Sequence, residues 1–221
     1  MDSFLKQSAE FLPILMQGLR LTVIVTVGSL ALSTVLGVVW ALMRVSGVPL
    51  LAGIAKTVVN VIRGIPIIVQ LFYIYFVLPD FGISLTAVQA AIIGLGVAYS
   101  AYQSENFRAG IEAIDRGQVE AAQSIGMGWW TTMRRVLLPQ AFKIVLPPYG
   151  NVMIMMLKDS SQASTITVAE LALQGKLIAS STFQNTTVFT LVAALYLCMS
   201  MPLILLVSRL EKRFGRSDRW R

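Results

Sequence analysis

Long apolar segments constrain this chain more than any other feature of its sequence. A helix needs about 20 mostly apolar residues to cross a bilayer. Only 13% of the 221 residues are charged, whereas about a quarter are charged in a typical soluble domain. The sequence therefore predicts an all-α membrane protein, with residues 1–221 forming one transmembrane domain. We predict five transmembrane helices, over residues 19–43, 54–78, 86–104, 138–157 and 188–207.

The second of these segments has the most irregular sequence. Lys56, Arg63 and Pro66 all lie within it. A proline inside a span is tolerated where neighbouring groups satisfy the carbonyls that it frees. We interpret Arg63, Gly64 and Pro66 as a kink in which the arginine side chain bonds those carbonyls.

Basic residues fall mainly on one of the two sides that five spans define. That side receives Arg44, Lys56 and the basic residues of segments 108–143 and 209–221. Because positive charge marks the cytoplasmic side, we predict an outside N-terminus and a cytoplasmic C-terminus. Asp2 and Glu10 interrupt the N-terminal region, so we expect an uncleaved first span rather than a signal peptide.

Several chemistries are excluded by composition. The chain has no histidine, which removes His-dependent triads, His-ligated metals and histidine proton relays. Its single cysteine, Cys198, lies in an apolar run and is expected to be a small buried hydrophobe. The sequence has no phosphate-binding loop, since Gly175-Lys176 is followed by leucine. We therefore predict no catalytic residues, no metal and no cofactor on this chain, and no nucleic-acid partner.

A charged segment with two tryptophans separates the third and fourth apolar runs. We predict one short helix over 118–125, ended by Gly126, and a second over 129–137, after which Leu138-Pro139 turns the chain back into the bilayer. Val119, Ala122 and Ile125 recur every three residues and give the first helix a narrow apolar face. On these grounds alone the segment 117–139 is either a docking element or an amphipathic hairpin that packs on lipid.

The order of residues in this segment resembles the EAA loop of ABC-importer permeases. The family pattern is Glu-Ala-Ala, a glycine, and a closing isoleucine-x-leucine-proline. This chain departs from the pattern only by Val136 in place of isoleucine. The matching residues are Glu120, Ala121, Ala122, Gly126, Leu138 and Pro139.

Further motifs are similar to the polar amino-acid uptake branch of that family, and they cover nearly the whole chain. The first resembles the branch's RGTPLLVQLF, with Ile65 in place of threonine. In chain order the motifs are RGIPIIVQLF from Arg63, AYQSENFRAGIEAI from Ala101, LPQAF from Leu138, LPPYGN from Leu146 and LKDSS from Leu157.

The resemblance implies the type I ABC-importer permease fold, with a cytoplasmic coupling helix in the EAA loop. The coupling helix would dock on separate ABC ATPase subunits, which would bind ATP and Mg²⁺. The other implied partners are a second permease subunit, identical or related, and an extracytoplasmic solute-binding protein. The implied function is alternating-access import of polar amino acids, and the implied location is the bacterial cytoplasmic membrane.

Ionisable residues at membrane depth are costly and mark candidate transport sites. Structural alternatives stay open, because Lys158 and Asp159 could pair locally, Glu105 could pair with Arg108, and Asn151 could bond a neighbouring helix. The predicted substrate path comprises Glu105, Lys158, Asp159, Ser160 and Gln162.

Two other classes of protein remain as alternatives. A secondary transporter or channel would need no ATPase, but it is expected to show an inverted repeat, and we find no repeat. An intramembrane enzyme would need a matched nucleophile and base. Ser160 and Lys158 are two positions apart and point to different sides of a helix. Co-purification with an ATPase would separate the three classes.

Overall fold

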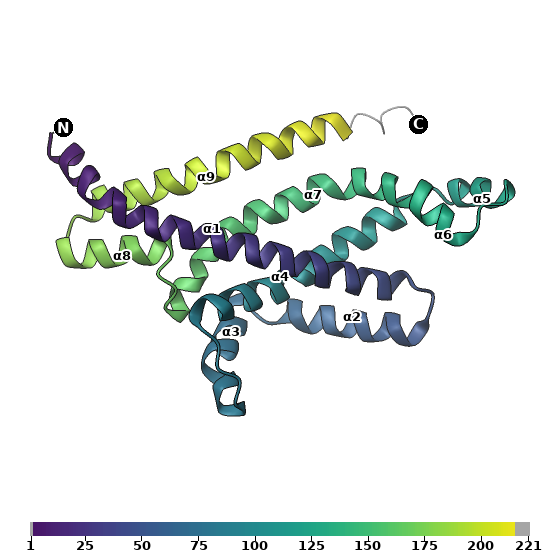
Figure 1. Ribbon diagram of the computed structural model, residues 1–221, viewed down its shortest axis with the longest axis horizontal. Helices are drawn as coiled ribbons and strands as arrows, with labels where there is room; N and C mark the ends of the chain where they lie inside the picture. The colour runs from purple at the N-terminus through teal and green to yellow at the C-terminus, as the bar shows by residue number, and fades with distance from the viewer. Residues whose placement is uncertain (1, 215–221) are drawn as a thin grey trace.

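The computed structural model describes residues 2–214, and every regular element within them is helical. Long helices form the frame of the molecule, and short helices and turns connect them (Figure 1). The long helices are α1 (Asp2–Val45), α4 (Ala87–Glu112), α7 (Leu138–Asp159) and α9 (Asn185–Phe214). The short helices are α2 (Pro49–Gly64), α3 (Ile67–Phe72), α5 (Arg116–Ser124), α6 (Trp129–Thr132) and α8 (Leu171–Thr182). Two wide turns have π-helical bonding, η1 (Tyr73–Val77) and η3 (Met133–Leu137). Two tight turns have 3-10 bonding, η2 (Leu78–Phe81) and η4 (Ser160–Ile166).

The helices α1 and α4 pack closely along their lengths because glycines remove side chains where they meet. A Cβ atom on Gly37 of α1 would lie 2.7 Å from the Cβ of Gln103, and one on Gly96 of α4 would lie 2.7 Å from Leu32. Small residues allow this close approach of helix backbones within membranes. The α1–α4 pair therefore forms the central spine of the molecule.

Two apolar clusters stabilise the rest of the bundle. The larger one joins α1, α3, α4 and α7 through buried residues that include Val25, Leu71, Leu95 and Met156. The second joins the start of α1 to α8 and α9. The polar stretch after α7 is thus held inside the bundle, with Ile166 in the first cluster and Leu171 and Ile178 in the second.

Two helices, Lys6–Val45 and Asn185–Phe214, are long and apolar enough to cross a membrane, among the residues that the structure describes. A third span is possible if the bent pair Pro49–Gly64 and Ile67–Phe81 counts as one. The predicted span 138–157 lies within α7, and the predicted span 86–104 lies within α4 except for Thr86, which caps that helix.

The predicted second span is bent by 98° where α2 meets α3. Ile65 precedes Pro66 and has an extended backbone (φ −108°, ψ 128°), as the bulk of a following proline requires. Gln70 Nε2 donates to the freed carbonyl oxygens of Ile62 (2.9 Å) and Ile65 (2.8 Å). The prediction that Arg63 bonds these carbonyls is wrong, because Gln70 reaches them from the next turn.

Beyond α4 the chain projects from one end of the bundle as a hairpin of α5 and α6 (Figure 1). The predicted turn at Leu138-Pro139 is not present. The backbone stays helical from α6 through the wide turn η3 into α7, and the Leu138 N–H bonds back to Met133. Pro139 comes two residues after the wide turn η3, where the regular i→i−4 bonding of the helix is already interrupted and a missing N–H is tolerated.

Candidate functional site

The α5–α6 hairpin, residues 115–137, is built by local capping. Asp115 caps the start of α5 by accepting a 2.6 Å hydrogen bond from the Gly117 N–H. At the other end Gly126 has φ +81°, a conformation that favours glycine, and the Met127 N–H bonds the Ala122 carbonyl at 3.0 Å. These signals place the end of the helix where the sequence predicts it.

The apolar stripe predicted for α5 does not form one outward face. Ala122 is 5% exposed and packs inside the hairpin, whereas Ile125 is 78% exposed. Glu120 and Ala121 also face outward. The surface that the hairpin offers to a partner is therefore formed by Glu120, Ala121, Ile125 and the exposed Trp129 and Trp130, with Ala122 supporting it from within.

Glu105 lies in a cluster of charges that joins α1, α2 and α4. One carboxylate oxygen is 2.5 Å from Arg44 and 3.4 Å from Arg63, and the other is 2.9 Å from Arg108. Arg108 also pairs with Glu112, and Arg63 lies over the ring of Tyr102. The pairing of Glu105 with Arg108 is thus confirmed, and two further arginines share the carboxylate.

The electrostatics of this cluster favour an ionised Glu105. A carboxylate shared by several arginines joins three helices through charge-assisted hydrogen bonds.

Asp159, at the end of α7, accepts a 2.6 Å hydrogen bond from the hydroxyl of Tyr99 on α4. Tyr99 precedes Glu105 by six residues, which corresponds to about 9 Å along the helix. The structure therefore places Glu105 and Asp159 at different levels of the bundle.

Lys158 lies on a different surface from the Tyr99–Asp159 contact. It lines a cavity of about 380 Å³ between α7 and α9, together with Asn151 and Glu211. Asn151 Nδ2 is 3.3 Å from Glu211 Oε1, so the predicted helix-to-helix bond of Asn151 is confirmed. Lys158 is exposed beside this polar contact.

The remaining predicted path residues lie in the turn η4. Ser160 is buried and donates a 2.7 Å hydrogen bond to the Leu157 carbonyl, so its hydroxyl is used within the turn. Gln162 is half-buried, and its backbone carbonyl accepts from Thr165 at 2.7 Å. The structure thus distributes the predicted residues over several surfaces instead of one pocket.

Glu170 is a buried residue that the sequence reasoning missed. It caps α8 by accepting from the N–H groups of Ala172 (2.9 Å) and Leu173 (2.8 Å). The hydroxyls of Tyr196 on α9 (2.8 Å) and Thr22 on α1 (3.4 Å) donate to the same side chain. Burial raises the pKa of Glu170, although all four donors act to lower it. The sequence did contain a signal for this role, because an acidic residue directly before an apolar helical run suits the positive end of the helix dipole.

Residues 33–216 match the family model described as "Binding-protein-dependent transport system inner membrane component". The chain belongs to this family. The match confirms the resemblance to ABC-importer permeases that the EAA loop indicated. The family is that of a permease, which is the non-catalytic subunit of an ABC transporter.

Curated relatives match nearly the whole length of the permease. It is 37% identical to "Probable amino-acid ABC transporter permease protein YckA" of Bacillus subtilis, over 95% of this chain and 93% of that protein. It is 39% identical to "Probable glutamine ABC transporter permease protein GlnM" of the same organism, over 91% and 94% of the two chains.

Solved structures show the same fold. A chain of "Crystal structure of an amino acid ABC transporter with histidines" is 38% identical to the permease, with a TM-score of 0.87 over 95% of this chain and 98% of that one. A chain of the MetNI methionine ABC transporter, 22% identical, matches with a TM-score of 0.77 over 91% and 96% of the two chains. The all-helical architecture is therefore that of ABC-importer permeases.

Proposed function

We propose that this chain is the transmembrane subunit of an ATP-driven importer of polar amino acids. The observation that carries the proposal is the match along 95% of the chain to a relative named as an amino-acid ABC transporter permease. The structural match to an amino acid ABC transporter supports the same substrate class.

In this proposal the chain crosses the bacterial cytoplasmic membrane five times. The spans are α1, the bent α2–α3 pair, α4, α7 and α9. The N-terminus lies outside and the C-terminus lies in the cytoplasm, because the basic residues gather at one end. The α5–α6 hairpin follows α4 and precedes α7, so it belongs to the same side as Arg44 and Arg209.

The hairpin is the proposed coupling element. ABC ATPase subunits would bind its outward face, and ATP and Mg²⁺ would be bound by those subunits. Glu120, Ala121 and Ile125 supply contacts, while Ala122 and Gly126 hold the shape. Leu138 and Pro139 continue into α7 and would transmit movement of the hairpin to that helix.

The complete importer would also contain a second permease subunit and an extracytoplasmic binding protein. Glu105, Lys158, Asp159, Ser160 and Gln162 remain the proposed substrate path. Lys158 and Asp159 lie next to each other on α7 but face different neighbours, α9 and α4. They would therefore meet the substrate from different sides, or at different stages of alternating access.

Co-purification tests the coupling proposal. The permease is co-expressed with its proposed partner ABC ATPase, and the ATPase retained with the permease is measured. Ile125→Arg is expected to lower retention strongly, because it places a charge at the most exposed apolar position of the hairpin. Phe183→Arg is the matched control. Phe183 is also an exposed apolar residue (84%), but it lies at the end of α8 and outside the hairpin.

Retention that is equal in Ile125→Arg and the unmodified chain would reject the hairpin as the docking surface. Amino-acid uptake by vesicles that contain the permease without any ATPase would instead favour the secondary-transporter alternative and reject the proposed function.

A further inference from the structure

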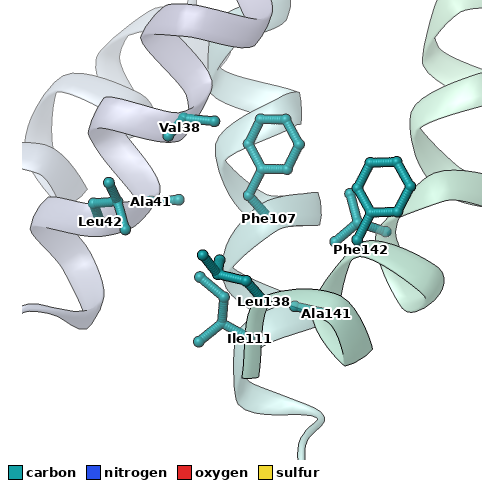
Figure 2. Close-up of a pocket in the computed structure, with 9 residues that line it drawn as sticks. Val38, Ala41, Leu42, Phe107, Ile111, Leu138, Ala141 and Phe142 are labelled. Atoms are coloured by element: carbon teal, nitrogen blue, oxygen red, sulfur yellow. The ribbon is translucent and has the colours of Figure 1, made fainter. Parts of the chain in front are cut away.

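An apolar groove lies between α1, α4 and α7, near the end of the bundle that carries the hairpin. Its volume is about 350 Å³, which lies in the ordinary range of about 300–1,000 Å³ for small-ligand sites. Figure 2 shows Val38 and Leu42 of α1, Phe107 of α4, and Leu138 and Phe142 of α7 around a common space.

The packing of the helices leaves this space open. Ala41 of α1 and Ala141 of α7 are buried lining residues, and they are too small to fill it. Gly110 of α4 lies directly against Val145 of α7, so these two helices meet on one side of the groove. The wall residue Phe142 is 64% exposed, although it is aromatic and lies beside an apolar hollow.

Basic residues lie close in sequence to the groove lining on the α7 side. Arg134, Arg135 and Lys143 are exposed, and no ion pair involves them within the described part of the chain. Arg134 and Arg135 precede the lining residue Leu138 by about one turn, whereas Lys143 is one position after Phe142 and is therefore turned about 100° from it around the helix. The arginines of the Glu105 cluster lie at the corresponding ends of α1 and α4, because Arg44 follows Leu42 and Arg108 follows Phe107.

We propose that this groove binds one acyl chain of an anionic phospholipid, with the lipid phosphate on Arg134 and Arg135. Basic pockets between transmembrane helices select anionic headgroups by charge, and the apolar lining accepts the acyl chain. The basic C-terminal segment 209–221 of this chain or of a second copy is a poor occupant, because its charge has the same sign. This inference concerns a lipid site and does not depend on the transported substrate.

The test uses the permease–ATPase complex in phosphatidylcholine vesicles that contain a small amount of a diazirine-bearing lipid. The probe is phosphatidylglycerol in one sample and phosphatidylcholine in the other. After illumination, labelling is quantified by mass spectrometry on the tryptic peptide 109–116, which contains the lining residue Ile111. This peptide is unchanged in all variants, so their yields can be compared directly.

The expected result is preferential labelling by phosphatidylglycerol. Neutralising Arg134 and Arg135 to glutamine should lower that labelling, by about fivefold for each charge removed. Val38→Trp should abolish labelling by filling the groove. Val35→Trp, on the same helix at a 62% exposed position outside the lining, should leave it unchanged.

Equal labelling by the two probes would overturn the claim of an anionic ligand. Absence of labelling by both would show that a lipid does not occupy the groove, and a protein partner would then be the remaining occupant. Equal loss in Val35→Trp and Val38→Trp would show that the label does not come from the groove. Size-exclusion profiles and ATPase retention confirm that each variant complex is assembled before these results are compared.

Discussion

The hydroxyl of Tyr99 donates a 2.6 Å hydrogen bond to Oδ2 of Asp159 and so joins the middle of α4 to the end of α7. Tyr99 is almost fully buried, so this contact fixes the direction of the Asp159 side chain. The sequence alone suggested Lys158 as a partner of Asp159, whereas the structure pairs Asp159 with a tyrosine from another helix. A carboxylate can accept several hydrogen bonds, and Asp159 therefore keeps acceptor capacity for a substrate.

The first prediction concerns the charge of Asp159. Asp159→Asn keeps the size of the side chain but removes its charge, so uptake of a cationic amino acid should weaken by about 1–3 kcal/mol in kcat/KM. Tyr99→Phe is the matched control, since it removes the donor and retains the carboxylate. Transport assays on both variants measure the difference. Equal losses would mean that the pair acts as a structural contact and that Asp159 does not bind substrate.

The second prediction concerns the Glu105 cluster. Glu105→Gln leaves Arg44, Arg63 and Arg108 without their shared carboxylate, so the free energy of unfolding should fall by about 1–2 kcal/mol. The side chains are partly exposed, which limits the loss. Glu112→Gln removes a more exposed carboxylate that pairs with Arg108 alone, and it should cost about 0.5 kcal/mol or less.

Thermal unfolding of the purified permease in detergent measures both glutamine variants. An equal effect of Glu105→Gln and Glu112→Gln would show that the shared contacts to Arg44 and Arg63 contribute nothing to stability.

The third prediction uses two glycines of the hairpin. Gly126 has φ +81° and open space around it, so Gly126→Ala introduces backbone strain without a clash and should cost about 1 kcal/mol. Gly128, also in open space, has φ −66° and should tolerate alanine. The rate of proteolysis within residues 115–137 measures local opening. Faster cleavage of Gly128→Ala than of Gly126→Ala would contradict the geometry described for the hairpin.

The fourth prediction concerns the buried carboxylate of Glu170. Glu170→Gln replaces one of the two carboxylate oxygens with an NH₂ group, which cannot accept from the donors that surround it. The free energy of unfolding should therefore fall by about 2–4 kcal/mol. Tyr196→Phe removes one donor only and should cost about 1 kcal/mol. Chemical or thermal unfolding gives the comparison. A glutamine variant as stable as the unmodified chain would remove Glu170 as the residue that fixes α8 to α1 and α9.

The fifth prediction concerns orientation in the membrane. Cys198 is exposed, so the expectation of a buried cysteine is wrong, and it is replaced here by serine. In this Cys198→Ser background, a cysteine at the exposed Asp80 position should react with a membrane-impermeant thiol reagent in intact cells. A cysteine at Arg116, which begins α5, should react only after the cells are permeabilised. The reverse pattern would invert the proposed topology and place the hairpin outside.

Sequence patterns located most helices because apolar runs and capping residues act locally. Thr86 forms a capping box with Gln89, and α4 begins at the next residue, within one position of the predicted span. Asp115 and Gly126 bound α5 in the same way. The path through Leu138-Pro139 was missed because the wide turn η3, which lets the helix continue past the proline, has no signal in the sequence.

By itself, the sequence determined that the chain is a helical membrane protein and, through the order of residues from Glu120 to Pro139, which family it belongs to. Only the tertiary structure decided which side chains meet. Glu105 with Arg44, Asp159 with Tyr99, and Glu170 with Tyr196 join residues 26 to 61 positions apart. Helix periodicity fixes neighbours one turn away, whereas such contacts depend on how helices cross, and that is set by the close packing of glycines such as Gly37 and Gly96 against neighbouring helices.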